Sequence, residues 1–200
     1  MDAVAKAPIT MCLSKATLAA GSTTTISTTG TTTYIIESFF YTKTAITNGA
    51  TPTTDWVTGN AFIPIPIPGT TTGLPGGVPT APTAGGYACA YTIGFDHSGN
   101  VKAIQGPIVA LDTNGNFISA APTLNPALGP AGPNPGAIAG GVSADNDFCP
   151  IGFVVTKLGS AAAATWTFGT NNFSSVTGYT WSFNDVSTLP DGSLSSLTYA

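Results

Sequence analysis

The sequence predicts an all-β fold: an antiparallel sandwich or jelly-roll-like barrel of roughly eight to ten short strands in one domain. Three observations support it. Thr, which is β-branched and favours strands, occupies 33 of 200 positions. The 24 Gly and 16 Pro punctuate turns. In residues 87–95, "YACAYTIGF", large and small side chains alternate with the period of a strand.

Residues 1–20 are expected to form an N-terminal arm leading into the fold, with at most a weak helical pattern over 11–20. The run 22–45 has two β-forming halves around Gly30 and predicts a hairpin there. In its second half, Tyr34 and Phe40 share one parity while Ile35 and Phe39 share the other. Both faces of this strand are apolar, so we expect both to be covered.

Two long loops interrupt the β pattern. Residues 62–86 contain 12 Gly or Pro, and their alternating Ile-Pro run favours an extended, polyproline-like backbone. No charged residue occurs between Trp56 and Phe95, which favours a loop lying on a surface, its own or a neighbour's, over a free tether. Residues 120–142 hold 10 Gly or Pro and no charge. A loop of this length is unusual in a compact domain unless it is functional or disordered.

Between and after these loops the strands resume. Residues 87–119 read as a meander of about four strands with turns at "DHSGN" and "DTNGN". In the last third, strands are expected at 152–158 and 164–169. The segment "YTWSF" (179–183) is expected to pair with "TWTF" across a hairpin loop from Gly169 to Gly178.

Charge argues against a nucleic-acid partner. The chain has five Lys, no Arg and a formal net charge of −4, with only 7% charged residues. Nucleic-acid binding normally rests on a basic surface. No stretch approaches the ~18 apolar residues of a membrane helix, so no membrane partner is expected. The N-terminus, with Asp2, Pro8 and Lys15, makes a poor signal peptide, so use without Sec export is expected.

The runs "FDHSGNVKAI" (95–104) and "LDTNGNFISA" (111–120) invite comparison with calcium loops. An EF-hand loop needs a bidentate Glu at position 12, but counting from Asp96 and Asp112 gives Pro107 and Thr123. Asp capping a turn, followed by Gly in a positive-φ conformation, explains both runs better. The sequence therefore predicts two hairpin corners and no metal.

No residue stands out as catalytic. His97 is the only His and lies in a turn, with no G-x-S-x-G motif in the chain. Glu37, the only Glu, is expected at a strand surface or paired with Lys. Asp145 and Asp147 are the closest carboxylates, and a solvated loop explains them. We expect no enzymatic activity, no cofactor and no catalytic, cofactor-binding or metal-binding residue.

The cysteines and most of the tryptophans are also expected to have structural roles. Three widely spaced Cys make neither a disulfide framework nor a zinc pattern, so buried thiols are expected, with one disulfide left open. Trp166 and Trp181 alternate within expected strands and suit a core or a subunit contact. Trp56, in a loop, is the candidate for a glycan-binding groove. The cysteines are Cys12, Cys89 and Cys149.

Four stretches in order carry a resemblance: "LSKATLAAGSTTTISTTGTTTY" (13–34), "TNGATPTTDWVTGNAF" (47–62), "GFDHSGNVKAIQGPIVALDTNGNFI" (94–118) and "CPIGFVVTKLGS…TWTFGTNNFSSVTGYTWSFNDVSTLPD" (149–191). Together they resemble a group of small virion proteins of tailed bacteriophages. Similar members often end in "LPDRP". Here the end is "LPDGSLSSLTYA", so any contact made by that Arg is not carried over.

The resemblance implies a head cement or decoration protein, made in the host cytoplasm and located on the capsid surface. Its implied partners are the major capsid protein and further copies of itself, as a dimer or trimer. The expected contact regions are the arm 1–20 and the loops 62–86 and 120–142. The alternatives are a tail fibre or spike receptor-binding module, a tail-tube or connector component that forms rings, and a hydrolase with His97 as base.

Overall fold

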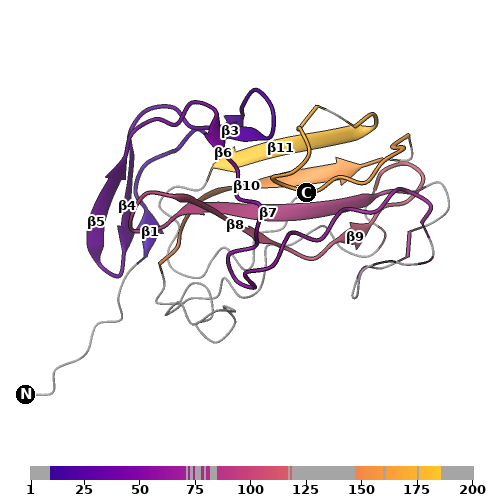
Figure 1. Cartoon of the computed structure of the whole chain (residues 1–200), viewed down its shortest axis with the longest axis horizontal. Helices are drawn as coiled ribbons and strands as arrows, with labels where there is room; N and C mark the ends of the chain where they lie inside the picture. The colour runs from indigo at the N-terminus through magenta and orange to yellow at the C-terminus, as the bar shows by residue number, and fades with distance from the viewer. Residues whose placement is uncertain are drawn as a thin grey trace, which may run out of the picture.

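The computed structural model describes residues 10–70, 72, 74, 78, 80–81, 85–116, 118, 147–159, 161–174 and 176–185 (Figure 1). These residues contain eleven strands in three antiparallel sheets and no helix, so the all-β prediction is confirmed. The arrangement is consistent with a sandwich, and none of the described sheets closes into a barrel. No helix within the described residues has the length and hydrophobicity needed to cross a membrane.

The main sheet is built around β7 (Tyr87–Phe95), which Figure 1 shows running through the middle of the molecule. On one side β7 pairs with β10 (Cys149–Leu158), and β10 pairs with the edge strand β11 (Tyr179–Asp185). On the other side lie β8 (Val101–Gln105) and the short β9 (Val109–Ala110). Because β8 and β9 pair with successive parts of β7, they form one interrupted edge, and the predicted four-strand meander is wrong.

Two smaller sheets are formed by residues near the N-terminus. The first has the order β1-β4-β5 and lies at one end of the main sheet, and the second has the order β2-β3-β6 (Figure 1). Their strands are β1 (Met11–Cys12), β2 (Ala19–Ala20), β3 (Thr25–Ser27), β4 (Thr32–Ile36), β5 (Phe39–Lys43) and β6 (Gly49–Ala50). The described part of the predicted arm, residues 10–20, therefore contains two short strands and no helix, and it is part of the fold and not a free arm. Its Ala16 and Leu18 are buried.

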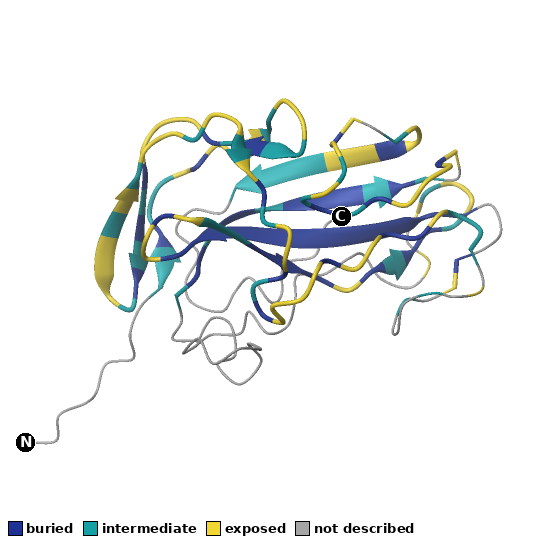
Figure 2. Cartoon of the chain, in the orientation of Figure 1, coloured by how far each residue is buried: buried dark blue, intermediate teal, exposed yellow. Residues whose placement is uncertain are grey.

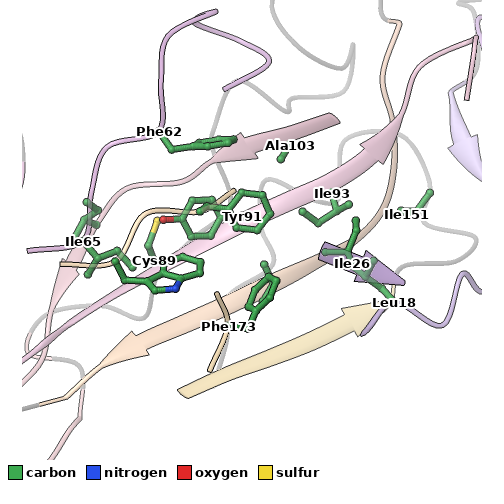
Figure 3. Packing of buried hydrophobic residues seen from close by; sticks show 14 of the residues in the cluster. Leu18, Ile26, Phe62, Ile65, Cys89, Tyr91, Ile93, Ala103, Ile151 and Phe173 are labelled. Carbon is green, nitrogen blue, oxygen red and sulfur yellow. The ribbon is translucent and has the colours of Figure 1, made fainter. Parts of the chain in front are cut away.

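The core lies against one face of β7. All nine residues of β7 are buried (Figure 2), and the large ones point to the same face, as the alternation predicts. Figure 3 shows Tyr91 and Cys89 on this face with Phe62, Ile65 and Phe173 around them. The core therefore packs the main sheet against residues of two loops, one that precedes β7 and one that follows β10 in the sequence.

The predicted hairpin around Gly30 is wrong. Gly30 does adopt a positive φ of 72°, but β3 pairs with β2 and β6, and β4 pairs with β5. The hairpin turn is instead Glu37-Ser38, with φ of 51° and 71°. A two-residue turn with both φ positive is ordinarily Asn-Gly or a similar pair. Glu-Ser therefore gave no turn signal in the sequence.

The predicted hairpin between 164–169 and 179–183 is also wrong. Trp166 forms an isolated bridge with Ile65, and all of β11 pairs with β10. Residues 167–171 turn immediately after Trp166, with the N–H groups of Thr170 and Asn171 both donating to the Thr167 carbonyl. The chain therefore leaves the extended conformation too early to form a second strand. The predicted strand at 152–158 is confirmed within β10.

Candidate functional site

The two similar turns have the same hydrogen-bond pattern. Asp96 accepts from the Asn100 N–H at 2.8 Å, and Asp112 accepts from the Asn114 and Asn116 N–H groups, both at 2.8 Å. These bonds, with the Asn116 N–H first, lower the pKa of Asp112. The predicted tight turns with Gly99 and Gly115 at positive φ are confirmed. The first turn joins the β7–β8 hairpin, but β9, which precedes the second turn, pairs with β7, so the second predicted hairpin is not found among the described residues. The carboxylates already serve as caps. No three His, Cys, Asp or Glu side chains among the described residues are grouped to hold a metal ion.

Gly115 is expected to matter through its backbone alone. Its φ is +79°, and an added Cβ would meet no atom within 4 Å. Gly115→Ala should therefore lower the free energy of unfolding by about 1 kcal/mol, the cost of placing an L-residue in the left-handed region. Urea denaturation would measure this. Asn114→Ala in the same turn is the control and should change stability by less than about 0.5 kcal/mol. Equal stability of Gly115→Ala and the unsubstituted protein would contradict the expectation.

His97 is tied to Asp147, a contact that the sequence analysis missed. The Asp147 carboxylate accepts from the His97 backbone N–H at 2.6 Å and lies 2.5 Å from His97 Nδ1. The two residues are 50 positions apart, and each was predicted only as a solvated loop residue. The bond fastens the β7–β8 turn to the chain entering β10. Asp145 lies outside the described residues.

This pair predicts a pH-dependent stabilisation. The hydrogen bond from His97 to Asp147, then the charge of Asp147, raises the pKa of His97 above its ordinary 6.5, and Asp96 adds to the shift. A raised folded-state pKa contributes stability that is complete below the unfolded-state pKa and is lost as pH rises through the folded-state value. The stability difference between the unsubstituted protein and Asp147→Asn should thus be larger at about pH 5.5 than at about pH 8.5.

Because His97 is the only His, an NMR titration reports its pKa without ambiguity. We expect a midpoint above 6.5 that falls towards 6.5 in the Asp147→Asn variant. In that variant the Asn amide oxygen can still accept the hydrogen bond from the His97 backbone N–H. A midpoint unchanged by Asp147→Asn would contradict the contact.

The three thiols are buried and free, which confirms the prediction that they are small core residues. The single disulfide that the sequence allowed is not formed. Burial raises the pKa of Cys89 to about 12 and also raises the pKa values of Cys12 and Cys149. Because the thiolate is the reactive form, these thiols are poorly suited to nucleophilic chemistry at neutral pH.

The tryptophans divide between core and surface. Trp166 is fully buried, while Trp181 on β11 is 38% exposed. Trp56, the candidate for glycan stacking, is half-buried, and Lys102 Nζ lies 4.4 Å from the centre of its ring. That contact occupies one face of the ring. Asp96 holds Lys102 in place by an ion pair of 3.5 Å.

Asp55 organises the loop that carries Trp56, which the sequence did not reveal. Asp55 is 5% exposed, and its carboxylate accepts from three backbone N–H groups, those of Val57, Thr58 and Gln105, at 3.0, 2.8 and 2.7 Å. The role of this residue is structural, because two of the bonds fix the turn of the loop itself and the bond from Gln105 fastens the loop to β8.

Of the predicted contact regions, residues 10–20 of the arm and part of the loop 62–86 can be placed. Phe62 and Ile65 are buried in the core, and Ile65 exchanges two backbone hydrogen bonds with Trp166. Ile63 and Ile67 are 41% and 37% exposed. The start of this loop therefore lies on the protein's own surface, anchored by Phe62, Ile65 and Pro66. Residues 1–9 and the loop 120–142 lie outside the described residues.

Among the described residues, the two most exposed aromatic side chains are on β5, where the sequence predicted a strand covered on both faces. Phe39 and Phe40 are 68% and 72% exposed, so within the described part of the chain that prediction is wrong (Figure 2). Because β5 is the edge strand of its sheet, no strand among the described residues lies beside Phe39 and Phe40 on their outer side to shield them. Glu37, expected at a strand surface, lies in the adjoining turn.

Comparison of the chain with protein-family models, with curated proteins and with solved structures found no match.

Proposed function

We propose that this chain is a non-enzymatic structural protein of a tailed-bacteriophage capsid, of the cement or decoration type. It would be made in the host cytoplasm and bind the lattice of the major capsid protein on the capsid surface, stabilising it. The resemblance of four sequence stretches to small phage virion proteins supports this role. An all-β fold with only 7% charged residues suits a protein that buries surface against neighbours.

The observation that carries the proposal is the segment 62–68, which we call the Ile-Pro segment. Phe62 and Ile65 fix it to the core, while Ile63, Pro64 and Ile67 face outwards. The result is an apolar, uncharged and extended surface held rigidly, which loses little conformational entropy on binding. An apolar, uncharged surface of this kind suits contact with another protein.

Capsids of the encoding phage, assembled without this chain, provide the test. Purified protein should bind them saturably in co-sedimentation. The Ile63→Ser, Ile67→Ser variant should bind at least about tenfold more weakly, because it loses apolar contact area at the interface. Ile118→Ser, which alters an isoleucine that is 50% exposed outside the segment, is the control and should bind normally.

A point-variant test is needed because removing residues 62–86 would also remove Phe62 and Ile65 from the core. Such a deletion would unfold the protein and would not isolate the contact. Normal capsid binding by the folded double variant would contradict the role of the Ile-Pro segment. Absence of binding by the unsubstituted protein, or binding to tails alone, would contradict the capsid role itself.

A further inference from the structure

The β4–β5 hairpin leaves an apolar edge uncovered. Phe39 and Phe40 are the two most exposed large apolar residues in the described part of the chain. They are neighbours in a strand, so their side chains lie on opposite faces of the sheet. On the outer face, the pairing register aligns Phe40 with Ile35 of β4 and Met11 of β1. An apolar row thus crosses the whole sheet and ends at the β5 edge.

The backbone of this edge is also open. Ile36 and Phe39 close a two-residue turn and form a hydrogen-bonded pair, and such pairs alternate along an antiparallel ladder. The N–H and C=O groups of Phe40 and Thr42 therefore point away from β4. Within the described residues β5 pairs with β4 alone, and neither Pro nor a bulge interrupts the strand. Natural edge strands are usually blunted by such devices.

The hairpin carries two charges of opposite sign, so its charge pattern is complementary to that of a second, antiparallel copy. Glu37 lies at the turn and Lys43 at the far end of β5, and the ion pairs of the described residues involve neither. When a second hairpin approaches antiparallel, its order is reversed. Glu37 of each copy then lies towards Lys43 of the other, twice in one interface. This match comes from the chain itself and favours a second copy over an unrelated strand.

We infer that β5 is a dimerisation edge, at which two copies of the chain pair antiparallel about a two-fold axis at Tyr41. Full overlap of Phe39–Lys43 places Phe40 opposite Thr42 of the other copy, with reciprocal backbone hydrogen bonds, and Phe39 beside the other Lys43. The two three-stranded sheets become one continuous sheet, and the apolar rows of its outer face join. The inference is independent of the proposed capsid role, because it concerns the free protein.

A charge swap tests the inference on the full chain by sedimentation-velocity ultracentrifugation over a range of concentrations. The unsubstituted protein should form a dimer. Glu37→Lys and Lys43→Glu should each raise the dimer dissociation constant at least about tenfold, because each places like charges together. The combined Glu37→Lys, Lys43→Glu variant should restore it to near the original value. Rescue by the second substitution is not expected if either residue acts only within its own hairpin.

A further variant separates dimerisation from folding. Glu37→Asn replaces a strained residue with one that tolerates positive φ, so its thermal midpoint should rise while dimerisation weakens. A monomeric unsubstituted protein at about 100 μM, well above the micromolar range of weak specific dimers, would overturn the inference. A dimer or trimer insensitive to both single charge substitutions, Glu37→Lys and Lys43→Glu, would overturn it as well. A monomer whose Phe40→Asp variant loses capsid binding would assign the edge to the capsid protein instead.

Discussion

Replacing Trp166 with alanine is expected to lower the free energy of unfolding by about 4 kcal/mol, a typical cost of truncating a buried Trp. Trp166 is fully buried, and its ring stacks on Tyr179 at 4.7 Å and meets Phe173 at 5.8 Å and Tyr91 at 6.1 Å between centroids. Its Nε1–H also donates to the Asn172 carbonyl at 3.1 Å. Truncation therefore removes the centre of an aromatic cluster and leaves a cavity.

Trp181→Ala is the matched control, because Trp181 belongs to the same cluster but is 38% exposed. It should cost no more than about 2 kcal/mol, since water can reach the vacated space and only part of the side chain's burial is lost. Urea denaturation followed by far-UV circular dichroism measures both values. Equal losses for the two variants would contradict the placement of Trp166 at the centre of the core.

Replacing Asp55 with alanine is expected to cost about 3 kcal/mol or more, because it leaves three backbone N–H groups without their acceptor in a largely buried loop. Asp55→Asn should cost roughly half as much, since its amide oxygen can still accept from Val57 and Thr58, as the Asp55 Oδ1 atom does. The Gln105 N–H loses its acceptor in both variants.

Asp112→Ala provides the comparison for Asp55. Asp112 also caps two backbone N–H groups, but it does so in an exposed turn where water can replace it. Its replacement should cost about 1 kcal/mol or less. The measurement is again the free energy of unfolding in urea. Equal losses in the free energy of unfolding for Asp55→Ala and Asp112→Ala would contradict the burial of the Asp55 loop.

The features that the sequence predicted correctly depend on residues close together in the chain. The alternation in β7 marks a strand with one large-residue face, and this needs only nine consecutive residues. The turns at Asp96 and Asp112 are fixed by Asp capping and by glycines at positive φ, all within five residues. Local patterns of this kind can be recognised in the sequence without knowledge of the rest of the fold.

The features that it missed join distant segments. The bridge between Ile65 and Trp166, the pairing of β11 with β10 and the contact of His97 with Asp147 have no local pattern, because each partner is chosen by the packed fold. The β4–β5 hairpin was missed for another reason: Glu37 and Ser38 are uncommon at positive φ. The open edge of β5 follows from that hairpin, so the sequence did not predict this edge either.

A cryo-electron microscopy map of the virion that encodes this chain tests the proposed capsid role most directly. The proposal predicts density for this all-β fold on the outer surface of the head lattice, with the Ile-Pro segment against the major capsid protein. Density for the chain in the tail fibre, tail tube or connector, or a complete virion without the chain, would contradict it.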